Sequence, residues 1–69
     1  MKRSKQEMIE IVESDRIRKR RNKMLSDSDW TQVSDAPVDQ AAWATYRQAL
    51  RDITEQNGFP IEVTWPVEP

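Results

Sequence analysis

The sequence of 69 residues contains no cysteine and no histidine, and it has a single glycine. Without cysteine the chain can form neither disulfides nor thiolate metal sites, and without histidine it lacks the commonest general base and metal ligand. One glycine is too few for a phosphate-cradling loop. The apolar runs are far too short to span a bilayer, and the first residues lack the apolar stretch of a signal peptide. We therefore expect a cytosolic protein with no membrane partner and no cofactor.

The charges are unevenly distributed, although the net charge is only −1. Residues 1–23 carry nine basic and four acidic side chains, whereas residues 24–69 carry two basic and eight acidic ones. Six of the basic residues lie within 16–23, a run that could bind nucleic acid by neutralising phosphates. The sequence pI of 5.3, the acidic second half and the absence of aromatic residues within the run argue against nucleic acid as a partner. A solvated helix face, or contact with an acidic partner surface, is the preferred interpretation.

A chain of this length forms one domain at most, and it buries only about 60% of the surface that its unfolded form exposes. Its three tryptophans offset this small size, because each aromatic side chain can bury about 150–250 Å². Trp30, Trp43 and Trp65 are therefore expected to hold the core together.

A first helix is predicted to begin at Lys5, because Ser4 and Glu7 are spaced as a capping box. Two apolar stripes of this helix face nearly opposite directions at ~100° per residue. The first stripe comprises Met8, Ile9, Ile11 and Val12, and the second comprises Ile17, Met24 and Leu25. Either the chain breaks at Ser14 or Asp15 and residues 5–25 form two helices, or one helix presents its first stripe to another chain. The second explanation is favoured because residues 13–16 contain neither proline nor glycine.

A second helix is predicted at about 39–55, with Asp39 as its N-cap. Its apolar stripe comprises Ala42, Trp43, Tyr46, Ala49, Leu50 and Ile53. The opposite, solvent-facing side is expected to carry Gln40, Arg47, Gln48 and Arg51. Asn57 and Gly58 are predicted to supply a left-handed stop after the helix.

The last residues form an extended tail in this interpretation, since Pro60 and Pro66 exclude a helix and apolar residues alternate with polar ones up to Trp65. No second strand is available to pair with the tail, so we expect it to lie across the helices with Trp65 inserted.

The predicted fold class is all-α: a helical hairpin with a long N-terminal helix, a second helix, and an extended C-terminal tail that contains proline and tryptophan. Residues 1–15 would form an amphipathic N-terminal arm, and residues 16–69 a small helical domain stapled by tryptophans. The predicted structural core comprises Met24, Leu25, Trp30, Trp43, Tyr46, Leu50, Ile53, Phe59 and Trp65.

Catalysis and metal binding find little support in the sequence. Asp27, Asp29 and Asp35 match only the first part of a calcium-binding loop, so we interpret them as turn formers and caps. A hairpin of this size has little room for a concave pocket that would perturb the pKa values of catalytic groups. We predict no catalytic residue, no metal ligand and no enzyme activity.

Several short segments carry a resemblance to a known family. They are Arg21-Asn22 with Met24-Leu25, Ser28-Asp29-Trp30-Thr31, Asp35-Ala36-Pro37, the ten residues 43–52, Phe59-Pro60, and Trp65-Pro66 with Pro69. In this order they resemble the small domain of tailed-bacteriophage tail assembly chaperones, a family similar also to the C-termini of tail fibre assembly proteins. The resemblance covers residues 21–69, and residues 1–15 match no part of it.

The resemblance implies a bacteriophage protein that assists tail or tail-fibre assembly without catalysis in the host cytoplasm, and it leaves open retention in the virion tail. We expect a phage tail or tail-fibre protein as partner, and a homo-oligomer is left open. The residues predicted to bind the partner are Met8, Ile9, Ile11, Val12, Arg16, Lys19 and Arg20. Two alternatives remain: a permanent structural or adaptor subunit of the virion tail, and a small nucleic-acid-binding regulator that uses the basic helix 16–23.

Overall fold

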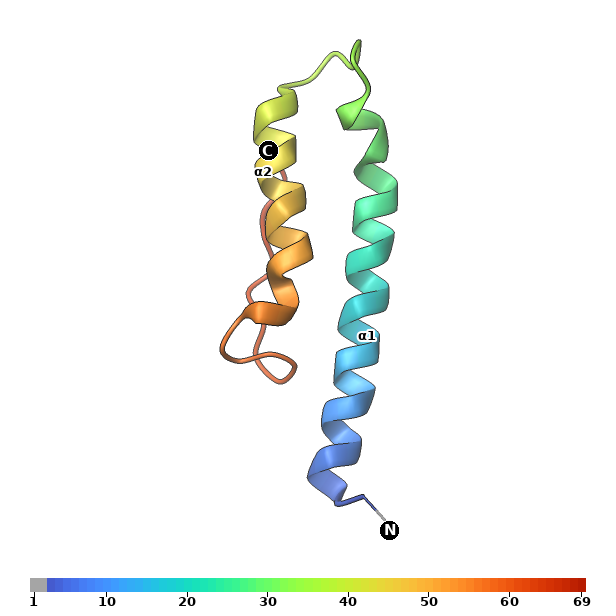
Figure 1. The fold of residues 1–69 in the computed structure, drawn as a ribbon, viewed down its shortest axis with the longest axis vertical. Coiled ribbons are helices and arrows are strands. Elements are labelled where there is room, and N and C mark those ends of the chain that lie inside the picture. The colour runs from blue at the N-terminus through green and yellow to red at the C-terminus, as the bar shows by residue number, and fades with distance from the viewer. Residues whose placement is uncertain (1–2) are drawn as a thin grey trace.

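The computed structural model describes residues 3–69 and shows two helices that run in opposite directions as a hairpin (Figure 1). The elements are α1 (Lys5–Ser28), the 3₁₀ helix η1 (Asp29–Gln32), α2 (Gln40–Arg51) and the 3₁₀ helix η2 (Asp52–Glu55). No strand occurs among the described residues. The all-α fold class is therefore confirmed.

Helix α1 is a single helix of 24 residues, so the two-helix alternative for residues 5–25 is wrong. It begins where predicted, because the Ser4 hydroxyl oxygen accepts a hydrogen bond of 3.1 Å from the Glu7 amide. It ends at Ser28, whose hydroxyl donates to the carbonyl oxygens of Met24 and Leu25 at 2.8 and 3.2 Å. The helix thus includes the polar residues Ser26, Asp27 and Ser28 in its last turn.

The connection between the helices is held together by side-chain hydrogen bonds. Thr31 is fully buried, and its hydroxyl donates to the Ser28 carbonyl oxygen at 2.6 Å. The Gln32 amide donates to the Gln40 carbonyl oxygen at 3.2 Å, and the Gln40 amide donates to the carbonyl oxygen of Val33. These bonds satisfy backbone groups that a loop leaves without helical partners.

Helix α2 begins after Asp39, whose carboxylate accepts a 3.0 Å hydrogen bond from the Ala42 amide. It ends at Arg51, and η2 continues the turn to Glu55, so the predicted helix at about 39–55 is divided into an α and a 3₁₀ part. The predicted left-handed stop is wrong, because Gly58 has no positive φ. A Cβ atom at Gly58 would instead lie 2.5 Å from the Glu62 carbonyl oxygen, so close backbone approach is what requires glycine there.

The core is small and lies between the two helices. Tyr46, Leu50 and Ile53 are its buried apolar residues. Five further predicted core residues are half-buried, namely Met24, Leu25, Trp43, Phe59 and Trp65.

Trp30 is a correction to the predicted core, since 51% of it is exposed. It lies in η1 at the closed end of the hairpin, where its ring centroid is 6.4 Å from that of Trp43.

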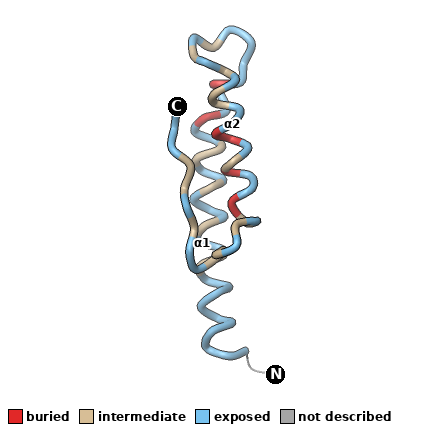
Figure 2. Tube along the Cα trace, turned by 90° about the vertical axis from the view of Figure 1, so that its left-hand side faces the viewer, coloured by how far each residue is buried: buried red, intermediate tan, exposed pale blue. Residues whose placement is uncertain are grey.

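The molecule is elongated, with extents of 53 × 19 × 13 Å and a radius of gyration of 14.9 Å. A compact chain of this length would have a radius of gyration of ~11 Å. The difference arises because α1 is twice as long as α2, and its N-terminal turns project beyond the rest of the fold (Figure 2).

The tail turns back after η2 and runs beside the helices (Figure 2). The Gln56 side chain fixes it through two 2.8 Å hydrogen bonds with the backbone of Thr64.

Candidate partner-binding face

Four apolar side chains project into solvent from the overhanging end of α1. The exposed fractions are 58% for Met8, 45% for Ile9, 46% for Ile11 and 53% for Val12. We call these four residues the arm patch. Clusters of exposed apolar side chains of this kind mark interaction surfaces in small soluble proteins.

The arm patch faces away from the core because of the helical repeat. At ~100° per residue it lies nearly opposite Ile17 and Met24, which are half-buried against the rest of the hairpin. Helix α2 and the tail both lie on that other side of α1 (Figures 1 and 2). No segment of residues 3–69 therefore covers Met8, Ile9 or Val12, whereas Ile11 lies at the edge of the arm patch that is nearer to the tail.

Two of the basic residues predicted to bind the partner follow the arm patch on α1. Arg16 lies 3.8 Å from the Glu13 carboxylate, and Lys19 forms a 3.0 Å ion pair with Asp15. All these side chains are substantially exposed, so the pairs are weak and can be exchanged for contacts with another surface.

Arg20, the third of these basic residues, is placed differently from the prediction. Its guanidinium lies 4.2 Å from the ring centroid of Trp65, and Arg18 lies 5.5 Å from the ring centroid of Phe59. Both arginines thus attach the tail to α1 by cation–π contacts. Arg20 thus contributes to the fold, and its role in partner binding stays a prediction.

The remaining cations of residues 16–23 also have partners within the chain. Lys23 pairs with Asp27 at 2.8 Å, and Arg21 donates to the Asn22 side chain at 3.0 Å. A nucleic-acid interface needs cations that converge on phosphates. Here each basic side chain of the run contacts an acidic, polar or aromatic neighbour instead.

Arg47 is the functional group that the sequence interpretation missed. It was assigned to the solvent side of the second helix, yet it is buried. Its guanidinium donates to the Leu25 carbonyl oxygen at 2.6 Å, the Ser28 hydroxyl at 2.8 Å and the Asp29 carboxylate at 2.7 Å. Arg47 thereby ties α2 to the C-terminal end of α1, where a cation also complements the helix dipole. Its position four residues after Trp43 was the one available signal, since i and i+4 share a helix face.

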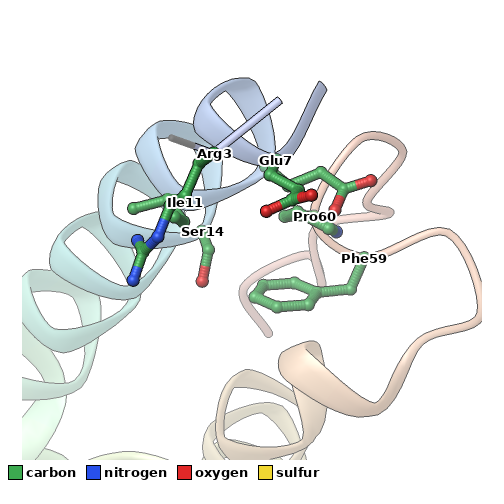
Figure 3. Close-up of a pocket in the computed structure, with 7 residues that line it drawn as sticks. Arg3, Glu7, Ile11, Ser14, Phe59 and Pro60 are labelled. Carbon is green, nitrogen blue, oxygen red and sulfur yellow. The ribbon is translucent and has the colours of Figure 1, made fainter. Parts of the chain in front are cut away.

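A groove of about 530 Å³ lies between the projecting part of α1 and the turn that begins the tail. Figure 3 shows the Phe59 ring and Pro60 on one side of it, with Ile11 and Ser14 on the other. Charged side chains of Arg3, Glu7 and Glu10 form its rim. Ile11 belongs both to this groove and to the arm patch, so the groove extends the apolar surface around the helix.

The acidic side chains of the described residues do not gather into a metal site. Within residues 3–69, no three acidic side chains come together as metal ligands do. Asp27 and Asp29, once considered as ligands, form ion pairs with Lys23 and Arg47. Burial raises the pKa of Tyr46, with the Glu68 carboxylate adding to this effect and Arg20 opposing it. This tyrosine lies in the core, away from any open groove described above.

Across the part of the chain that is described, neither helix combines the length and apolar character needed to cross a bilayer.

Comparison with known proteins gives one match. A family model described as phage tail assembly chaperone protein matches residues 14–69, which is more than half of the chain. The search of curated proteins and the search of solved structures each find no match. The family suggested by the tryptophan-bearing segments is thereby confirmed, and the arm patch lies just before the matched residues.

Proposed function

The chain belongs to the phage tail assembly chaperone family, and we propose that it binds a phage tail or tail-fibre protein through the arm patch, without catalysis. In this proposal the hairpin holds the arm patch away from its own core. The protein acts in the host cell while the tail is being assembled.

The observation that carries the proposal is the exposure of four apolar side chains on the side of α1 that the hairpin leaves uncovered. Residues 14–69, which the family model matches, contain the tryptophans, the Arg47 contacts and the tail, so we expect them to fold without residues 8–12. An apolar helix face that is not needed for folding is suited to receive an apolar segment of a client protein.

Arg16 and Lys19 support the choice of client chemistry. They follow the arm patch on the same helix, and their carboxylate partners are exposed and easily exchanged. We infer a client segment with apolar residues and neighbouring carboxylates. Such charge complementarity increases the association rate at low salt more than it increases the affinity.

Valine substitutions provide a matched test. Val12 and Val33 are 53% and 52% exposed, but Val12 lies in the N-terminal half of α1 whereas Val33 follows η1 in the connection between the helices. We expect Val12→Asp to abolish recovery of the phage tail and tail-fibre proteins in a co-expression pull-down. Val33→Asp should recover them as the wild type does. Equal recovery with both variants would refute the arm patch as the binding site.

A permanent place in the virion tail is the second possibility, and it uses the same surface. Mass spectrometry of purified particles distinguishes a departing chaperone from a permanent tail subunit. A chaperone that departs after assembly is absent from the particles, whereas a tail subunit is present in a fixed ratio to other tail proteins.

A further inference from the structure

We propose that, when no client is present, the arm patch is covered by the arm patch of a second copy of this chain, with the two α1 helices antiparallel. This goes beyond the proposed function, because it assigns a second occupant that the client must displace.

The register follows from the side of α1 that faces away from α2. Residues on this side are spaced alternately by three and four positions, as in the contact seam of two packed helices. In order they are Lys5, Met8, Val12, Asp15, Lys19, Asn22 and Ser26. Only Met8 and Val12 are apolar, so the apolar part of the contact is short and centred between them.

Charge complementarity selects the antiparallel orientation. In an antiparallel pair centred on the arm patch, Met8 meets Val12 of the second copy, and Lys5 meets Asp15 of the second copy. Each contact occurs twice by two-fold symmetry. A parallel pair would place Lys5 beside Lys5 and Asp15 beside Asp15, which is repulsive.

The required groups are accessible. Lys5 forms no ion pair with any other described residue, and Asp15 uses only Oδ2 for its contact with Lys19. Ile9 and Ile11 border the seam on its two sides and are each nearly half exposed. The second copy would approach from the side of α1 opposite to α2 and the tail, so it meets no part of the first hairpin (Figure 2).

The contact is too small for a permanent dimer. Stable complexes bury about 1,200–2,000 Å² in total, and eight half-exposed aliphatic side chains supply less than that. We therefore expect a dimer that dissociates in the micromolar range or above. Such a weak dimer covers the arm patch and so limits aggregation, and a client can displace the second copy.

The first test is sedimentation of the full chain across a range of concentrations. The wild type and Val33→Asp should shift from monomer to dimer, while Val12→Asp should remain monomeric. A wild type that is monomeric at every concentration, or a Val12→Asp variant that dimerises normally, would overturn the proposal.

Charge reversal tests the orientation. K5E alone and D15K alone should each raise the dimer dissociation constant about tenfold, because each turns two attractive contacts into repulsive ones. The double variant K5E/D15K should restore the wild-type value. Circular dichroism checks that α1 is still helical, since D15K also removes the pair with Lys19. A double variant as weak as the single ones would rule out the antiparallel register.

The two proposals can fail separately. A monomeric wild type whose client binding is lost in Val12→Asp leaves the proposed function standing and removes the dimer. A dimer that is weakened by each single charge reversal and restored by the double variant, with client binding unchanged in Val12→Asp, supports the dimer and removes the proposed function.

Discussion

At the scale of single residues, Arg47 shows how one side chain joins the two helices. Its guanidinium reaches a backbone carbonyl, a hydroxyl and a carboxylate within 2.6–2.8 Å, all at the end of α1. Lysine could not replace this geometry, because an ammonium group lacks the planar fork of donors. The two side chains of the Arg47–Asp29 pair should contribute unequally to the free energy of unfolding, since the Arg47 side chain is 10% exposed and that of Asp29 is 67% exposed.

Replacing the two partners separately should reveal this inequality. Arg47→Leu removes three hydrogen bonds at a buried position, so we expect a loss of about 2–3 kcal/mol in the free energy of unfolding. Asp29→Asn keeps a hydrogen-bond acceptor at an exposed position and should cost below about 1 kcal/mol. Urea denaturation measures both. Equal losses would contradict the assignment of Arg47 as the central contact.

Tyr46 should make the stability sensitive to alkaline pH. Burial raises the pKa of its hydroxyl above the ordinary value of 10.0, and Glu68 raises it further. Below pH 10 both states keep the proton, so the full stability is present. As the pH rises above 10, the unfolded state loses the proton first, so the free energy of unfolding falls.

Tyr46→Phe is the control for this effect. The Tyr46 hydroxyl is buried with no hydrogen-bond partner among the described residues, so its removal should leave stability at pH 7 equal or up to about 1 kcal/mol higher. Thermal melts at pH 7 and 11 should show a smaller alkaline loss in Tyr46→Phe than in the wild type. An identical loss would show that other groups cause it.

At the scale of elements, some contacts that hold the helices join residues close together in the sequence, whereas others join residues far apart. The N-caps Ser4 and Asp39 each bond an amide three residues ahead, so local spacing was enough to predict them. Arg47 was misassigned because its partners lie 18–22 positions away, which no helical periodicity records. Trp30 was misassigned because composition indicates that an indole is worth burying but not whether the fold can cover it. The exposed stripe on α1 could be predicted, since both stripes belong to one uninterrupted helix.

Gly58 determines how the tail leaves η2. Its carbonyl oxygen accepts hydrogen bonds from Ile61 and Glu62 at 2.9 and 2.8 Å, and a Cβ atom would be 2.8 Å from that of Glu62. Gly58→Ala should therefore open this turn and cost about 1–3 kcal/mol of stability. It should also displace Trp65 from Arg20, with a change in tryptophan fluorescence. The exposed neighbour Asn57 supplies the control, and Asn57→Ala should change neither quantity. A Gly58→Ala variant that melts like the wild type would contradict the close approach.

At the scale of the whole molecule, the fold separates its stability from its proposed binding surface. The buried residues and the Arg47 contacts lie in the hairpin, whereas the arm patch lies on the projecting end of α1 (Figure 2). Helical turns without tertiary contacts open easily and exchange their amide hydrogens rapidly. A client that covers these turns should slow this exchange greatly.

Amide hydrogen exchange with and without the bound tail protein tests the central claim most directly. We expect the largest added protection in residues 5–19, with residues 29–39 at the other end of the molecule unchanged. Protection concentrated in residues 29–39, with residues 5–19 still exchanging as in the unbound protein, would contradict the arm patch as the binding surface.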